Sequence, residues 1–242
     1  KIGKMAFLSS VNARIYIPQS VTDIEKKAFN DNAVIYGYAN SAAEEFAKNN
    51  DIKFVAVNSH DEYLSLLTYS DTDNSSYKSA IDELSQLGII NGFEDGTFKP
   101  QDNVPRAQAA TMFATALGYS DTKYQNIATD KAVFSDFLMS HWAYKYADYV
   151  MKSADISSGE THCILSGFED GTFRPDNNVT IIQLLKMAIC SLGEDGYMAE
   201  AVENGGYPNG YNTVAGKYGF SKSIAVDDIN QPATREQTAQ II

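Results

Sequence analysis

The chain has 242 residues, which is enough for one or two domains with a buried core. Hydrophobic residues make up 44% of it and charged residues 21%, a balance typical of a folded protein. The formal net charge of -12 argues against nucleic-acid binding, because phosphates require basic surfaces. An anionic partner must therefore be held by a local site. No stretch approaches the run of about 18 apolar residues that predicts a membrane span.

The first 57 residues have a period of their own. Three apolar residues recur 22 positions later, Ile2, Ala6 and Phe7 as Ile24, Ala28 and Phe29. Short strands are predicted within 14–24 and at 33–37, a helix at 41–50 with a Ser-x-x-Glu capping box, and a closing strand at 52–57. This pattern resembles the BspA-type leucine-rich repeat of bacterial surface proteins. The resemblance implies a small β-solenoid whose helix and last strand cap a longer array that begins before Lys1.

Residues 58–66 are predicted to be a linker, because Asn58–Glu62 is polar and has no hydrophobic period. His60 is interpreted as a solvated loop residue. A different period begins beyond this segment. We therefore expect residues 67–242 to form a domain that separates from residues 1–57.

The strongest pattern in the chain is a nine-residue repeat. Gly92–Pro100 reads Gly-Phe-Glu-Asp-Gly-Thr-Phe-Lys-Pro, and Gly167–Pro175 repeats it with Arg in place of Lys. Asp and Gly between aromatic residues predict a tight turn, with Gly at positive φ, and Phe98 and Phe173 are expected to fill the apolar gap beneath. Each copy is followed by an apolar helix that is expected to end at a glycine.

The motifs around this repeat resemble the S-layer homology domain. They run in the expected order, as Tyr69–Asp71, Leu87–Gly92, the nine-residue repeat and Val104–Gln108, and the second copy adds Phe134–Asp136 and His141–Ala143. The resemblance implies three repeats, at about 67–120, 121–193 and 194–242, arranged as a pseudo-three-fold helical trefoil. With the leucine-rich part, the expected fold is mainly α in this region and α+β overall.

The repeats are not equivalent. The first helix of repeat one is predicted to bury Tyr77, Ile81, Leu84 and Leu87 and to stop at Gly88. Repeat two is expected to carry Trp142, Tyr146, Tyr149 and Val150 on one helix face and to contain an insertion near 154–163. Repeat three lacks the Asp-Gly-Thr-Phe turn, although its first helix is expected to end at Gly219. Cys163 and Cys190 are interpreted as buried free thiols rather than a disulfide.

The helix starts carry the candidate binding chemistry. Thr180 and Thr234, each followed by Gln three residues later, predict capping boxes that put Arg235, and by alignment Arg106, at the first helical position. A cation there opposes the helix dipole. Two explanations stay open: the arginine pairs with a carboxylate such as Asp71 or Asp136, or it binds an anion beside free helix N–H groups.

The resemblance favours ligand binding, because in S-layer homology domains this arginine lies in grooves that receive a pyruvylated cell-wall polysaccharide. It places Asp71, Asp136 and Trp142 near the grooves, where Trp142 could stack on a sugar, although for a single Trp on an amphipathic helix a core position is the favoured interpretation. Ile181 replaces the arginine in repeat two and Pro105 replaces the capping Thr in repeat one. At least one groove is therefore expected to lack its anion clamp.

The expected function is non-catalytic anchoring at the bacterial cell surface, outside the cell. The S-layer homology region would bind a cell-wall polymer, and the leucine-rich array would be displayed for a protein partner. The alternative is a protein–protein adhesion module whose repeats no longer bind glycan. Catalytic motifs are missing from the sequence. No metal or other cofactor is expected, since the loop at Asp71 lacks calcium ligands and His162 with Cys163 is too small a zinc set.

Overall fold

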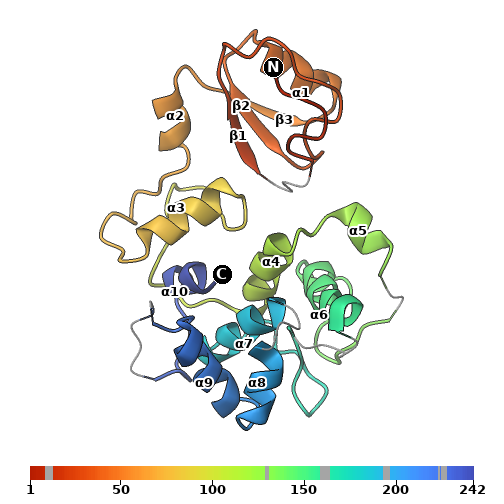
Figure 1. Ribbon diagram of the computed structural model, residues 1–242, viewed down its shortest axis with the longest axis vertical. Helices are drawn as coiled ribbons and strands as arrows, with labels where there is room; N and C mark the ends of the chain where they lie inside the picture. The colour runs from red at the N-terminus through yellow and green to blue at the C-terminus, as the bar shows by residue number, and fades with distance from the viewer. Residues whose placement is uncertain (9–12, 129–130, 159–163, 193–196, 223, 225–227) are drawn as a thin grey trace. The chain divides into compact units, whose positions relative to one another are not determined.

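A computed structural model describes the chain except for residues 9–12, 129–130, 159–163, 193–196, 223 and 225–227. Within the described part it consists of helices and one three-stranded sheet, which agrees with the α+β expectation (Figure 1). Two compact units are present, Lys1–Lys99 and Pro100–Ile242. The first unit runs past the boundary expected at residues 58–66. Whether residues 67–242 fold independently remains a prediction.

The first unit is built on a parallel sheet. Its strands are β1 (Arg14–Ile17), β2 (Val34–Gly37) and β3 (Lys53–Ala56), in that order, with Arg14 opposite Val34 and Val34 opposite Lys53. Ahead of the sheet, isolated parallel bridges join Ile2 to Ile24 and Phe7 to Phe29. Residues that are 22 positions apart in the sequence are therefore paired side by side in the structure.

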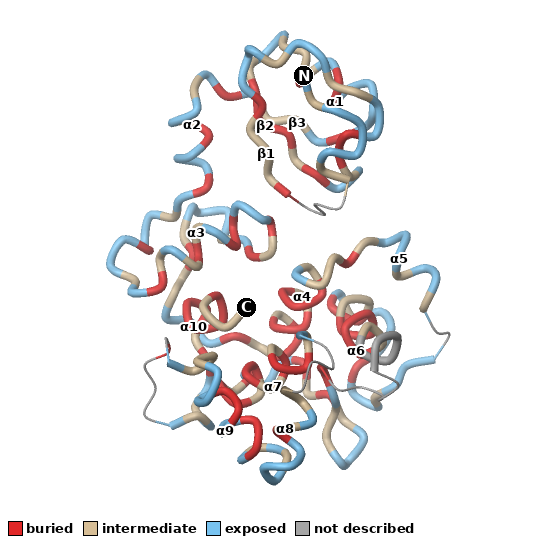
Figure 2. Tube along the Cα trace, in the orientation of Figure 1, coloured by how far each residue is buried: buried red, intermediate tan, exposed pale blue. Residues whose placement is uncertain are grey.

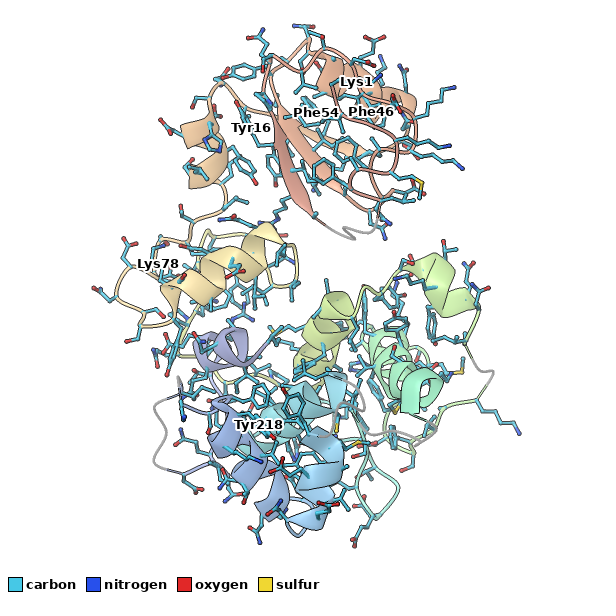
Figure 3. The ribbon with its side chains drawn as sticks, viewed as in Figure 1. Lys1, Tyr16, Phe46, Phe54, Lys78 and Tyr218 are labelled. Atoms are coloured by element: carbon cyan, nitrogen blue, oxygen red, sulfur yellow. The ribbon has the colours of Figure 1, made fainter. Side chains whose placement is uncertain are left out.

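Helix α1 (Ala42–Asn49) covers one face of this sheet (Figure 1). Phe46 of the helix and Phe54 of β3 both belong to the apolar cluster beneath it (Figure 3). The hydroxyl of Ser41 accepts from the Glu44 N–H at 3.4 Å, as the capping signature predicts. The Glu44 carboxylate accepts from the Asn40 N–H at 2.6 Å, so the return bond of the box is made one residue earlier than expected.

The segment predicted as a linker contains a short helix, α2 (His60–Ser65), so His60 is the first residue of a helix and not the loop residue that was expected. Ser59 caps it by accepting from the Glu62 N–H at 3.0 Å. Tyr63 is buried against the second face of the sheet, and its hydroxyl donates to the Arg14 carbonyl at 3.0 Å. The His60 ring lies 4.9 Å from that of Tyr16, the β1 side chain on this face (Figure 3). A helix of six residues is too short to show a period in sequence.

Helix α3 (Lys78–Gln86) opens the first repeat. Ile81 and Leu84 are buried as predicted, and Gly88 follows with a φ of 69°. Leu87 is 48% exposed, which corrects its assignment to the core. It lies at the C-cap, where the chain leaves the helix and no longer presents a regular face.

The second unit contains the remaining helices: α4 (Arg106–Ala116), α5 (Asp121–Gln125), α6 (Tyr144–Ser158), α7 (Ile181–Ser191), α8 (Tyr197–Glu203), α9 (Asn209–Tyr218) and α10 (Arg235–Ile241). Helix α4 packs on α6, and α7 packs on α8, α9 and α10. Helices α4 and α7 are buried over most of their length (Figure 2). Gly118 and Gly219 follow α4 and α9 at positive φ, as predicted.

The structure tests the prediction of buried free thiols at Cys190 only. Cys190 is a buried free thiol with its sulfur 3.7 Å from the Tyr211 hydroxyl. Cys163, His162 and the core of the predicted insertion lie outside the described residues.

A closed ring of backbone hydrogen bonds joins the segments that precede α4, α7 and α10. The Val104 N–H donates to the Ala233 carbonyl at 3.0 Å, the Ala233 N–H to the Val179 carbonyl at 2.9 Å, and the Val179 N–H to the Val104 carbonyl at 2.9 Å. All three residues are fully or almost fully buried. The ring therefore holds the three helix starts around one centre.

Candidate ligand-binding pocket at the start of helix α4

The two copies of the nine-residue repeat fold into the same turn. In the second copy the Asp170 carboxylate accepts from the Thr172 N–H at 3.0 Å and from the Thr172 hydroxyl, and the Phe168 N–H donates to the Thr172 carbonyl at 2.8 Å. Gly171 has a φ of 77°. Phe173, like its counterpart Phe98 in the first copy, is fully buried. The sequence prediction of an Asp-capped turn over a phenylalanine plug is confirmed.

Asp136 holds this turn in place. Its two carboxylate oxygens accept from the N–H groups of Phe173 at 2.7 Å and Arg174 at 2.8 Å. Asp71 does the same for Phe98 and Lys99 in the first copy, at 2.8 Å each. Among the residues that the structure describes, neither aspartate forms an ion pair with an arginine. The aspartates hold the two turns through main-chain N–H groups, and the described residues show no ion pair of the kind that the carboxylate alternative expected.

The N–H groups at the helix starts are already bonded. A matching set links the first residue of each helix to a neighbouring segment: the N–H of Arg106 donates to the Asn177 carbonyl at 2.9 Å, that of Ile181 to Gln231 at 3.2 Å, and that of Arg235 to Asp102 at 2.9 Å. The second N–H of each helix donates to a carbonyl as well. The first two N–H groups of each helix are therefore not open to an anion, which removes most of the free donors that one of the two sequence explanations requires.

Side chains, in contrast, make one helix start unusual. Arg106 is only 6% exposed, and its guanidinium donates from Nε to the Phe173 carbonyl and from Nη2 to the Ser166 carbonyl, both at 2.8 Å. The rings of Phe168 and Phe173 lie 4.9 and 4.7 Å from its Cζ. Within the described part of the chain no carboxylate forms an ion pair with it. Burial lowers the pKa of Arg106 to about 10, and the nearby Asp136 carboxylate opposes that shift only in part.

Arg106 lines a pocket of about 640 Å³. Its walls come from the second turn, from α7 and from the segment before α9, and apolar side chains such as Leu165 and Met187 contribute to them. The polar lining contains the cations Arg174 and Lys186, the carboxylates of Glu169 and Asp170, and the Gln183 and Tyr207 side chains. At neutral pH the guanidinium remains charged, because its pKa lies well above 7. The pocket therefore offers a buried positive charge to an anionic group that also carries apolar surface.

Comparison with known proteins identifies the repeats. Residues 68–110 and 161–180 match the S-layer homology domain family. The chain carries an S-layer homology domain.

Relatives of this S-layer homology domain occur in much larger surface proteins. Cell surface glycoprotein 1 of Acetivibrio thermocellus is 38% identical over 91 residues, which is 38% of this chain and 3% of that protein. The cellulosome-anchoring protein of the same organism is 33% identical over 92 residues, 38% of this chain and 18% of that protein. The middle cell wall protein of Brevibacillus brevis is 27% identical over 155 residues, 64% of this chain and 13% of that protein. The chain thus spans less than a fifth of each of these relatives.

The other expected groove residues of the S-layer homology domain behave differently. Arg235 is buried, and its guanidinium donates to the Gln108 side chain at 3.4 Å. Ile181 is fully buried in the core, as an apolar residue at this position should be. Trp142 lies before α6 rather than on it and is 57% exposed, so both its predicted helix position and its core interpretation were wrong. The described structure thus brings one of the five expected site residues, Arg106, into a pocket.

Several pocket residues of the domain were missed by sequence reasoning. Tyr207 and Lys186 carry no motif of their own, and the pocket joins them to Arg106 across three segments that are distant in the chain. Burial raises the pKa of the Tyr207 hydroxyl, although half of the side chain remains exposed at the pocket. The one sequence signal for Lys186 was its position five residues after Ile181, on the predicted helix that follows the second turn. That position did not show that the Lys186 side chain points into the pocket, because distant segments of the chain form the pocket.

Two further properties of the described residues concern membranes and metals. None of the helices in the described part of the chain has the length and hydropathy needed to cross a lipid bilayer. The described residues also contain no cluster of three or more His, Cys, Asp or Glu side chains placed to hold a metal ion.

Proposed function

We propose that the chain is a non-catalytic anchoring module that acts outside the cell and binds a polysaccharide of the bacterial cell wall. One observation carries the proposal: a buried guanidinium lines a pocket, and no described carboxylate pairs with it. A buried charge without a counter-ion is costly, and an anionic ligand removes that cost. The relatives whose names refer to the cell surface, to the cell wall or to anchoring of a cellulosome support the same role.

The ligand we propose is an acidic polymer such as a pyruvylated secondary cell-wall polysaccharide. A ketal-linked pyruvate offers a carboxylate for Arg106 and a methyl group for the apolar wall that includes Leu165 and Met187. The net charge of -12 opposes the approach of any polyanion, so a local cationic pocket is needed. Binding should accordingly depend on this pocket rather than on the overall field of the protein.

The fold that we propose for the binding region is a three-repeat trefoil. The cyclic hydrogen bonds among Val104, Val179 and Ala233 support it, since each repeat contributes one donor and one acceptor to the same ring. For residues 1–57 we propose the last turns of a leucine-rich array that displays an adhesion surface. The parallel bridges of Ile2 to Ile24 and of Phe7 to Phe29 support that arrangement.

A pull-down with purified cell-wall sacculi tests the function. The chain should be retained on native sacculi and should not be retained after the secondary polymer is chemically stripped. Equal retention on both preparations would point to a wall component other than this polymer. Failure on native sacculi would contradict the proposal and would favour a protein–protein module.

A further inference from the structure

The chain that leaves the sheet packs back onto it. Tyr63 of helix α2 is buried, and so is Leu67, two residues after that helix. Both side chains belong to one apolar cluster with Tyr36 of β2 and Val57, which follows β3. The Tyr63 ring lies 5.1 Å from that of Tyr36 and 5.4 Å from that of Tyr16, which Figure 3 labels. The segment is therefore fastened to the sheet as far as residue 67.

The same segment then enters the first nine-residue turn. The Tyr69 hydroxyl accepts from the Gly92 N–H at 2.9 Å, and the Tyr69 ring lies 5.2 Å from that of Phe98. The fit is close, because a Cβ at Gly92 would clash with the Tyr69 ring. Asp71 follows and accepts from the Phe98 N–H at 2.8 Å. Thr68 alone therefore separates the part of the chain that the sheet holds from the part that the turn holds.

A second connection joins the sheet to the turn. Arg14, the first residue of β1, donates from Nη2 to the side-chain oxygen of Asn91, the residue before Gly92. The Arg14 carbonyl also accepts from the Tyr63 hydroxyl at 3.0 Å. One residue of the sheet therefore contacts both helix α2 and the start of the turn. Two parts that are joined at a single point can rotate about it, whereas a second point of contact restricts that rotation.

We propose that residues 57–71 are a rigid joint that holds the sheet in a fixed orientation relative to the first turn. Every contact of the joint lies within one compact unit, Lys1–Lys99. Apolar burial fastens the joint to the sheet, and hydrogen bonds to main-chain N–H groups fasten it to the turn. In an anchored surface protein, such a joint passes a pull on the leucine-rich part to the first repeat without a slack segment. That use rests on the proposed anchoring function, whereas the rigidity does not.

The test compares Leu67→Ala with Leu66→Ala in the complete 242-residue chain. These neighbours have the same side chain, but Leu67 is 2% exposed and Leu66 is 48% exposed, so Leu66→Ala is the matched control. Tyr63→Phe is a milder variant that removes only the hydroxyl bond to Arg14. A glutamyl endopeptidase measures how often α2 opens, because Glu62 lies inside that helix. NMR relaxation of backbone amides compares the tumbling of the sheet with that of the turn at 93–99.

In the wild type, the amides of the sheet and of the turn should report the same rotational correlation time. Leu67→Ala removes buried apolar surface, so cleavage after Glu62 should be about tenfold faster or more, and the sheet should tumble faster than the turn. Leu66→Ala should match the wild type, and the cleavage rate of Tyr63→Phe should lie between those of the two leucine variants. Separate tumbling of sheet and turn in the wild type would overturn the joint. Equal cleavage of Leu66→Ala and Leu67→Ala would overturn it as well.

The sacculus pull-down separates the joint from the anchoring function. Leu67→Ala should be retained on native sacculi as well as the wild type, because the pocket at Arg106 belongs to the second unit. A wild type whose sheet and turn tumble together but that fails on sacculi would contradict anchoring and leave the joint standing. A retained wild type whose sheet tumbles separately would contradict the joint alone.

Discussion

The starts of helices α4 and α7 have matching backbone hydrogen bonds but different side chains. At both starts the first and second N–H groups donate to carbonyls of a neighbouring segment, and the residues before them, Val104 and Val179, bond to each other. Yet Arg106 at the first position of α4 faces a pocket, whereas Ile181 at the first position of α7 is buried in the core. The same frame therefore supports a pocket-lining position in one repeat and a packing position in the next.

The comparison teaches that the backbone frame of the repeat does not depend on which side chain occupies the first helical position. Hydrogen bonds of the main chain fix the helix starts, and these bonds do not depend on which side chain is present. The first helical position is then free to change from Arg to Ile without loss of the ring.

The largest effect should come from making α7 resemble α4. Ile181→Arg puts a cation at a fully buried position in the apolar core, and Ile181 is not among the residues that line the pocket at Arg106. The free energy of unfolding should fall by about 3 to 5 kcal/mol. Ile181→Met, which nearly conserves volume, should cost under about 1.5 kcal/mol in the same urea titration. A loss below about 1 kcal/mol for Ile181→Arg would mean that the two helix starts are interchangeable.

The reverse change, Arg106→Ala, should affect both stability and binding. The carbonyl groups of Phe173 and Ser166 lose their donor, and Phe173 is fully buried. The free energy of unfolding should therefore fall by about 1 to 3 kcal/mol. Retention on sacculi should be lost as well. Arg106→Lys is the charge-conserving control, and it should recover binding only in part because an ammonium lacks the planar fork. A variant that loses stability but binds sacculi normally would show that Arg106 is purely structural.

A smaller difference should appear at the caps. The Thr180 hydroxyl accepts from the Gln183 N–H at 3.4 Å and the Gln183 side chain accepts in return at 3.2 Å, whereas Pro105 gives α4 no side-chain cap. Thr180→Ala should cost about 1 kcal/mol of unfolding free energy. Thr111→Ala in the interior of α4 is the matched control and should change it by less than about 0.5 kcal/mol. Equal effects would show that the capping box contributes nothing to this frame.

The smallest effect is a titration at the turn beside the pocket. Hydrogen bonds from Thr172, followed by Arg174, lower the pKa of Asp170 to about 2, and Thr97 lowers that of Asp95 in the other copy. A lowered carboxyl pKa stabilises the folded state above the unfolded pKa of about 4, and this contribution is lost as the pH falls toward 2. Carboxyl NMR titration should place Asp170 below Asp95, and Arg174→Gln should bring the two together. Coincident titration in the wild type would contradict the ion pair.

Local signals in the sequence were sufficient for much of this fold. Asp170 with Gly171 predicted the turn, and Thr180 with Gln183 predicted a helix start that the structure places at the next residue. Longer-range features were not accessible. The six-residue helix α2 is too short to show a period, and the burial of its Tyr63 depends on a hydrogen bond to Arg14 in a distant strand.

The candidate site was only partly predictable for the same reason. The position of Arg106 at a helix start followed from alignment of the repeats, but its real partners are main-chain carbonyls, which have no sequence signature. Trp142 was placed on a helix by its spacing from Tyr146, whereas α6 begins only at Tyr144. Lys186 enters the pocket through a contact with Ser166 that depends on tertiary packing.

The three-membered backbone ring also constrains how the protein is made. Val104 receives its donor from Val179 and gives its own N–H to Ala233, which is synthesised more than a hundred residues later. A solenoid can add one repeat at a time as each leaves the ribosome, but this ring stays open until its last member has been translated. Closure over such sequence distances is intrinsically slow. We therefore expect the ring to close only after Ala233 has been synthesised, so that the helix starts at Arg106 and Ile181 gain their full set of backbone bonds late in folding.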